Sequence, residues 1–151
     1  MLVSTKGRYA LRLVTRIAGS GGRGPVSLRT VATDEEISLK YLEQLARPLA
    51  RAGILKSLRG KGGGYELAVP AERISAGDVL RAVEGSTSAV SCMALEEGGF
   101  CPREGHCTTV GFWAGLNRVV ERYVDGVTVA DLAKEFNAEQ PADRPLSREL
   151  P

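Results

Sequence analysis

The chain has 151 residues, 43% of them hydrophobic and 25% charged, a size and composition that suit one domain stabilised by its own core. No apolar run reaches the ~18 residues that a membrane helix needs, and Lys6, Arg8 and Arg12 interrupt the segment that a signal peptide would keep apolar, so we expect a cytosolic protein with no membrane partner. The net charge of +2 conceals a division, because residues 1–61 carry 12 Lys or Arg and 4 Asp or Glu, whereas residues 62–151 carry 8 and 14.

Residues 5–53 are predicted to form three successive helices. Ser27 is placed to cap the second of them, and a turn through residues 33–36 ends it. Ser38 caps the third, in which Pro48 predicts a bend or an early stop because it removes a backbone hydrogen bond. The first helix covers residues 5–18, where apolar side chains recur at three- and four-residue steps: Tyr9, Ala10, Leu13, Val14 and Ile17.

A β-hairpin is predicted next, with strands over residues 54–58 and 65–69. The connection from Arg59 to Gly64 reads RGKGGG, with four glycines and two cations in six residues. This composition predicts a flexible, positively charged tip, although a loop without any ligand has the same composition.

Three helices are predicted after the hairpin. One begins at the Ser75 cap and stops at Gly85, and a last short one covers residues 128–136. The tail 137–151 has three prolines, alternating charges and little to bury, which predicts disorder. The helix over residues 108–123 is longer, and its apolar side serves equally for a dimer seam or an internal core: Val110, Trp113, Leu116, Val120 and Tyr123.

This order of elements predicts a fold that is mainly α with a small β-hairpin wing, a winged helix-turn-helix over residues 1–85. A helix fits the major groove of DNA, where Gln44 can pair with adenine and Glu43 can accept from cytosine. The wing can reach the minor groove and the phosphates of DNA. The excess of positive charge in residues 1–61 also suits a polyanion such as DNA. The residues expected to contact double-stranded DNA are Lys6, Arg8, Ser27, Ser38, Lys40, Tyr41, Glu43, Gln44, Arg47, Arg59, Gly60 and Lys61.

Four stretches resemble the IscR-like winged-helix transcription regulators, many of which carry iron–sulfur clusters. They are STKGRYAL at 4–11, ISLKYLEQL at 37–45, GILKSLRGKGGGYEL at 53–67 and the cysteine loop at 86–107. The resemblance spans residues 1–132. It implies a homodimer, in which the segment 108–136 supplies a dimerisation helix that crosses onto the partner subunit. Two related wings and helices would then cover a palindromic operator, and we expect a repressor.

All three cysteines lie in that loop, with the spacing C-x8-C-x5-C. Zinc sites usually contain C-x2–4-C pairs, and this spacing has none. Thiols stay reduced in the cytosol, so a structural disulfide is not expected. Three thiolates from one loop suit an iron–sulfur cluster. The resemblance implies the same ligands, Cys92, Cys101 and Cys107, and we expect a 2Fe–2S cluster.

The fourth ligand is open between His106 and Glu43. The first cysteine gap is longer than the commoner spacing of the family, and Val110 stands where the family's best-known pattern has a histidine. His106 reaches a cluster if the loop turns sharply, and Glu43 does so if the loop packs against the DNA-binding part of either subunit. Arg8 stands where the nitric-oxide-sensing branch has an aspartate, which argues against that branch.

Two other functions compete with a cluster sensor. The cysteines can form a thiol or disulfide switch on the same DNA-binding protein, without any cluster. Cys107 beside His106 also suggests an enzyme with a cysteine nucleophile. Adjacent residues rarely point at one another, however, and His106 is the single histidine, so we expect no enzymatic activity.

Overall fold

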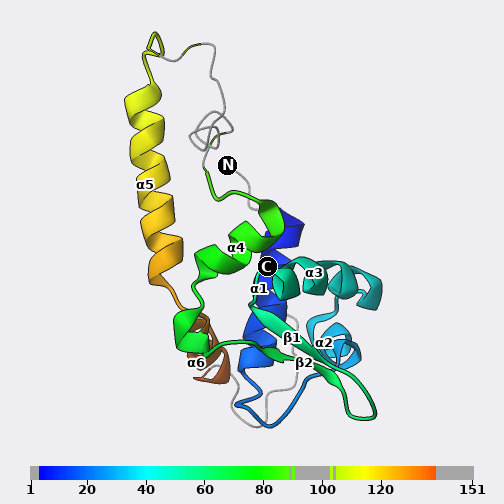
Figure 1. Ribbon diagram of the computed structural model, residues 1–151. Coiled ribbons are helices and arrows are strands. Elements are labelled where there is room, and N and C mark those ends of the chain that lie inside the picture. The colour runs from blue at the N-terminus through cyan, green and yellow to red at the C-terminus, as the bar shows by residue number, and fades with distance from the viewer. Residues whose placement is uncertain (1–3, 89, 91–102, 104, 139–151) are drawn as a thin grey trace, which may run out of the picture.

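The computed structural model describes residues 4–88, 90, 103 and 105–138, and of Phe136 and Ala138 only the backbone. A small antiparallel hairpin lies at the edge of a group of packed helices, and one long helix stands away from the rest (Figure 1). The elements are α1 Thr5–Ala18, α2 Leu28–Glu35, α3 Leu39–Arg51, β1 Leu55–Leu58, β2 Gly64–Leu67, the 3-10 turn η1 Ala71–Arg73, α4 Ala76–Glu84, α5 Val110–Gly126 and α6 Val129–Ala138.

Serine side chains fix where four of these helices begin. The hydroxyl of Ser27 accepts from the backbone N–H of Thr30, and Ser38 caps α3 in the same way. At α4 the bond is reciprocal, because the Asp78 carboxylate also accepts from the backbone N–H of Ser75. These bonds satisfy amides that a helix start leaves without partners. The predicted caps are therefore confirmed, and Ser4 caps α1 as well.

The core lies where α1, α3, α4 and α6 meet. The predicted apolar face of α1 is confirmed, since Ala10, Leu13, Val14 and Ile17 are all buried. Burying a large aliphatic side chain contributes roughly 1.5–3 kcal/mol, so this set supplies much of the stability of the fold. The largest fully buried side chains are Leu13, Leu42, Leu45, Leu49, Ile74, Val14, Val31, Val79 and Val129.

The hairpin pairs Leu55 with Leu67 and Leu58 with Gly64. Val26, ahead of α2, extends it by exchanging two backbone hydrogen bonds of 2.8 Å with Tyr65. A Cβ atom at Gly64 would lie 2.4 Å from the Val26 carbonyl oxygen, which explains the glycine at this position. The helix-turn-helix and the wing are therefore joined through backbone contacts.

Four local predictions were wrong in detail. The early stop at Pro48 is contradicted and the bend there stays a prediction, because α3 continues to Arg51 while Leu45, Ala46 and Leu49 pack into the core and offset the missing backbone bond. The turn expected at residues 33–36 is shorter, since α2 runs to Glu35 and only Glu36 adopts a left-handed conformation. The strands are also shorter than predicted, whereas α6 extends to Ala138, two residues beyond its predicted end.

Candidate nucleic-acid interface and cysteine site

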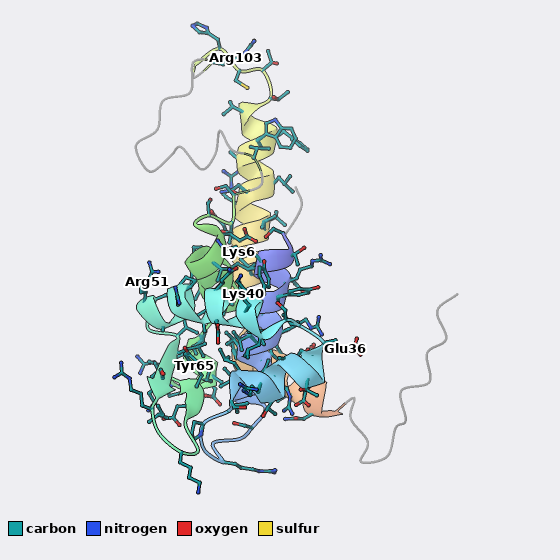
Figure 2. The ribbon with its side chains drawn as sticks, turned by 90° about the vertical axis from the view of Figure 1, so that its right-hand side faces the viewer. Lys6, Glu36, Lys40, Arg51, Tyr65 and Arg103 are labelled. Carbon is teal, nitrogen blue, oxygen red and sulfur yellow. The ribbon has the colours of Figure 1, made fainter. Side chains whose placement is uncertain are left out.

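The helix α3 presents a polar face to solvent. Its apolar stripe is buried in the core, so its other side chains point outward. Lys40, Glu43, Gln44 and Arg47 are all exposed, as the sequence predicts for a helix that reads base edges. Figure 2 looks onto this helix, with Lys40 near its N-terminal end and Arg51 at the other.

Tyr41 differs from the other predicted α3 contacts. It is half-buried, and its ring meets the ring of Tyr9 edge-on at 5.9 Å. The Arg12 guanidinium lies over the ring of Tyr9, with its central carbon 5.4 Å from the ring centre. Tyr41 therefore also fixes α3 against α1, and only its exposed part is available to DNA.

Cations at the edges of α3 supply positive charge. Lys6 and Arg8 are exposed at the start of α1, where Arg8 donates to the Thr5 hydroxyl at 3.3 Å. Arg59 and Lys61 are exposed at the tip of the wing on either side of Gly60. None of these four side chains forms an ion pair with any residue that the structure describes. They are therefore available to bind phosphates.

The glycines of the wing have a structural explanation of their own. A Cβ atom at Gly63 would lie 2.3 Å from the Leu58 carbonyl oxygen, so the tight turn itself excludes a side chain. We therefore infer DNA contact at the wing from the two cations Arg59 and Lys61, and not from the glycine content of its tip.

Two further cations of the basic half are already paired. Arg12 binds Glu35 at 2.8 Å, and Arg16 binds Asp34 with its Nε at 3.1 Å. Both pairs join α1 to α2, and exposed pairs of this kind are worth little to stability. The two carboxylates neutralise part of the positive charge of residues 1–61. The positively charged surface is therefore smaller than the number of Lys and Arg residues in the sequence suggests.

Cys107 is the predicted cluster ligand that the structure describes, whereas Cys92 and Cys101 lie outside the described residues. Its sulfur lies 3.5 Å from the Thr109 hydroxyl, just ahead of α5. Hydrogen bonds from the Thr109 side chain and backbone hold the pKa of the Cys107 thiol below its usual value. A lowered pKa favours the thiolate, which is the form of cysteine that binds metals and reacts with oxidants.

Replacing Thr109 by valine keeps the shape of the side chain and removes its hydroxyl. We expect Thr109→Val to raise the pKa of Cys107, so that alkylation of this thiol at neutral pH slows severalfold. The rate is followed against pH by mass spectrometry in a chain that also carries Cys92→Ala and Cys101→Ala. Thr108→Val is the matched control. If the pH midpoint of the alkylation rate is the same in Thr109→Val as in the parent chain, Thr109 does not lower the pKa of Cys107.

The two candidates for the fourth ligand lie in different places. His106 is exposed next to Cys107, and its backbone N–H donates to the Arg103 carbonyl at 3.0 Å. Glu43 is exposed on α3, and Arg103 lies at the far end of α5 from that helix (Figure 2). Of these two candidates, His106 is the one that lies near Cys107 within one chain. No group of three potential metal ligands occurs in the described part of the chain, which leaves out the other two cysteines.

The helix α5 leaves an apolar stripe uncovered. Phe112, Val119 and Tyr123 are 66%, 61% and 72% exposed, and Leu116 lies between them in the helical repeat. Trp113 and Val120 of the predicted stripe are half-buried beside these residues, at ~100° per residue along the same broad side of α5. Phe112 and Val119 were missed, although their spacing from Leu116 and Tyr123 is visible in the sequence.

The C-terminal end of α5 is fixed to the winged helix, and its N-terminal end projects away from it (Figure 1). Asn117 is the buried polar residue of this helix, and its side-chain amide donates to Glu121 at 2.9 Å. In the described residues no helix is both long and apolar enough to span a membrane. An exposed stripe of large apolar side chains marks an interaction surface.

A capped helix with an exposed polar face, beside a hairpin with unpaired cations, defines a winged-helix DNA-binding protein. Comparison with known proteins places it more narrowly. The family model described as Rrf2, iron-dependent transcriptional regulator, matches residues 3–135. The chain belongs to the Rrf2 family of transcriptional regulators, and the expected resemblance to IscR-like regulators is confirmed.

Three relatives cover nearly the whole chain. The regulator CymR of Bacillus subtilis is 39% identical over 142 residues, which are 94% of this chain and 96% of CymR. The structure of T. potens IscR has a TM-score of 0.75 at 33% identity and covers 95% of this chain and 94% of its own. The oxidised form of Staphylococcus aureus CymR has a TM-score of 0.68 at 38% identity, covering 89% and 97%. The predicted winged-helix fold is thus confirmed.

Gln44 and Lys61 should affect DNA binding in different ways. Gln44→Ala is expected to reduce discrimination at one base-pair position by about 1–3 kcal/mol, because it removes a base-edge contact. Lys61→Ala should weaken binding to every duplex alike and lower the slope of log affinity against log salt by about 1. Affinities for a selected duplex and its single-base variants, measured over a salt series, separate the two. If Gln44→Ala keeps every base preference of wild type, Gln44 does not recognise a base.

Proposed function

We propose that the protein is a cytosolic, homodimeric repressor that binds a palindromic operator and senses iron–sulfur or redox status through its cysteine loop. The exposed polar face of α3 beside the unpaired wing cations supports DNA binding most directly. The proposed DNA contacts are the twelve predicted from the sequence. Tyr41 keeps a second role in packing, and the hydroxyls of Ser27 and Ser38 also cap helices.

The second copy of the chain is the proposed partner for the uncovered stripe of α5. A stripe of large apolar side chains on a projecting helix is stable in water only if another surface covers it. Two copies that pack through this stripe also present two α3 helices to DNA, which matches a palindrome of two half-sites. The family resemblance, in which this helix crosses onto the partner subunit, supports the same arrangement.

An iron–sulfur cluster is the proposed ligand of the loop, held by Cys92, Cys101 and Cys107. The donor set fits such a group, because three thiols lie in one short segment and the pKa of the described one is lowered. The description of the matching family as iron-dependent also supports iron. When bound, the cluster supplies a link between the cysteines that oxidants and iron shortage remove.

Contacts at the end of α4 connect the start of the cysteine loop with the N-terminal residues that we propose to bind DNA. The loop leaves α4 directly after Glu84, and the Glu84 carboxylate accepts from the backbone N–H of Gly7 at 2.9 Å and from the Ser4 hydroxyl. The cations Lys6 and Arg8 lie in the same first turns of α1. A change in the loop therefore acts next to the N-terminal DNA contacts, as a two-state switch requires.

His106 is the favoured fourth ligand because it is the neighbour of Cys107 within one chain. Glu43 of either subunit remains the alternative ligand, and it requires the cysteine loop to pack against α3. Anaerobically purified protein should be coloured and contain iron, and His106→Ala should alter its visible spectrum whereas Glu43→Ala should not. Colourless, iron-free protein after cluster reconstitution would defeat the cluster proposal and leave DNA binding intact.

A thiol switch is the second candidate function. The lowered pKa of Cys107 and the existence of an oxidised form of S. aureus CymR favour it. A thiolate that reacts with peroxide forms a sulfenic acid or a disulfide. Mass spectrometry after peroxide treatment of iron-free protein distinguishes the two mechanisms, because only the thiol switch requires a defined cysteine adduct.

A further inference from the structure

The C-terminal end of α5 is joined to the start of α4 by backbone bonds. The backbone N–H of Ala76 donates to the Val127 carbonyl at 2.8 Å, and that of Val129 donates to the Ile74 carbonyl at 2.8 Å. Ser75 and Thr128 form the bridge between these bonds. These backbone bonds tie the C-terminal end of the projecting helix to the winged-helix body.

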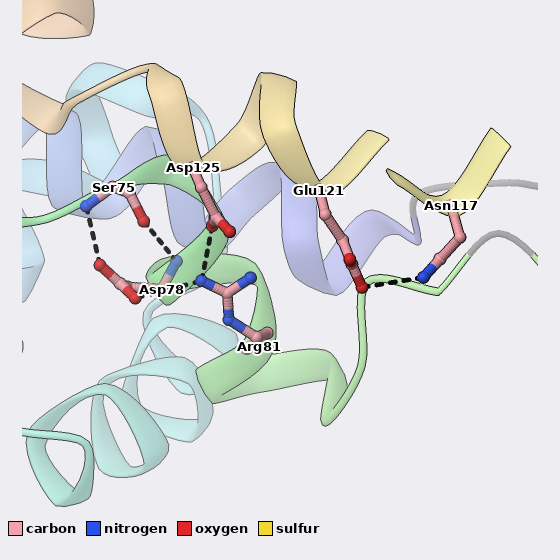
Figure 3. Close-up of polar contacts among 6 residues, drawn as sticks. All are labelled: Ser75, Asp78, Arg81, Asn117, Glu121 and Asp125. Carbon is pink, nitrogen blue, oxygen red and sulfur yellow. Dashed lines mark hydrogen bonds and ion pairs between the residues drawn. The ribbon is translucent and has the colours of Figure 1, made fainter. Parts of the chain in front are cut away.

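An ion pair lies directly beside these bonds. The Arg81 guanidinium of α4 binds the Asp125 carboxylate of α5 at 2.6 Å, and both side chains are close to half exposed. Figure 3 shows Arg81 between Asp125 and Asp78, the second of which binds it at 3.2 Å. Asp78 in turn caps α4 through Ser75. Arg81 thus connects the first turn of α4 to the last turn of α5.

Gly77 provides the space for this contact. A Cβ atom at Gly77 would lie 2.0 Å from the Asp125 carboxylate and 2.9 Å from the Arg81 guanidinium. Gly77 is buried inside α4, where alanine is the better helix former. A side chain at position 77 would therefore push the ends of Asp125 and Arg81 away from their present contact.

We propose that Arg81 and Asp125, packed over Gly77, set the angle between α5 and the winged helix and thereby the half-site spacing that the dimer accepts. This inference rests on the proposed dimeric DNA-binding function. Arg81 and Asp125 are positioning residues, which act on the placement of α3 and do not touch DNA.

The dimensions make this joint sensitive. The 17 residues of α5 span about 25 Å at ~1.5 Å per residue. A change of about 10° at one end of such a lever moves the other end by about 4 Å, close to the ~3.4 Å between successive base pairs. A small rearrangement at Asp125 is therefore enough to change the preferred spacing by one base pair.

The experiment uses a duplex that the full-length wild-type protein selects from a random library. Duplexes with one or two base pairs added to or removed from the centre of this operator form the test panel. We expect wild type to prefer one spacing, and Asp125→Asn to lower that preference by about two- to fivefold, the range that an exposed ion pair allows. Gly77→Ala should change it at least as much, because its Cβ displaces the carboxylate.

Asp78→Asn is the matched control, because it removes the other ion pair of Arg81 and leaves the link to α5. It should keep the wild-type spacing profile. Dimer mass and thermal unfolding are measured for every variant, so that a spacing change at unchanged mass and unfolding temperature cannot come from misfolding. If both test variants keep the wild-type profile, the inference is wrong. If wild type selects no duplex at all, the proposed DNA-binding function is wrong instead.

Discussion

The double variant Phe112→Glu, Val119→Glu is expected to be a monomer and to bind a two-half-site operator about 10²- to 10⁴-fold more weakly than wild type. The magnitude follows from effective concentration, because a dimer binds its second half-site as an intramolecular event and a monomer does not. Light scattering for the mass and a binding titration with the operator measure the two effects.

The physical reason lies in the uncovered stripe of α5. Burying a phenylalanine or valine side chain contributes roughly 1.5–3 kcal/mol, whereas burying a carboxylate without a partner costs several kcal/mol. Each substitution occurs once in each subunit, so four carboxylates would enter the seam. Folding of the monomer should be little affected, because Phe112 and Val119 are largely exposed in the single chain.

Arg118→Glu is the matched control for this variant. It changes the net charge of the chain by the same two units, and at ~100° per residue Arg118 lies on a different side of α5 from Phe112. This control should remain a dimer with wild-type mass. A double variant that remains dimeric would show that another surface joins the subunits.

Replacing Cys92, Cys101 and Cys107 together by alanine is expected to remove all bound iron and any effect of iron on DNA affinity. The three thiols are the proposed protein ligands that make the loop suitable for an iron–sulfur cluster, and alanine offers no donor. Iron per chain and operator affinity, both measured under anaerobic conditions with and without added iron, check the two parts.

The folded state of this triple variant should be close to wild type, because Cys107 is partly exposed and lies outside the core. Thr108→Ala serves as a control that changes the same loop and keeps all three thiols. If the triple variant still gains or loses DNA affinity when iron is added, the cysteines are not the sensor.

Local signals in the sequence predicted most of the fold. The range 5–18 predicted for α1 matches the structure because the 3.6-residue apolar repeat indicates it, whereas the Ser4 cap was not predicted. Pro48 misled the prediction of α3, since tertiary packing of Leu45 and Leu49 outweighs one missing hydrogen bond. The strands were predicted too long because β propensity does not show where backbone pairing ends.

The candidate site was less predictable than the fold. Residue type alone indicated the exposed face of α3 and the wing cations, but not that Arg12 and Arg16 are paired with α2. Those pairs, like the contact of Arg81 with Asp125, join residues far apart in the sequence. For the cysteine loop, the sequence identifies donor chemistry, and the structure adds the Thr109 contact at Cys107.

The most direct test of the central claim is the operator affinity of one anaerobic preparation before and after its iron is removed with a chelator. We expect a difference of about 5- to 150-fold, the usual range for coupling between two sites, and we expect it to disappear when all three cysteines are alanine. Equal affinities for the iron-loaded and iron-free wild-type protein would contradict the central claim.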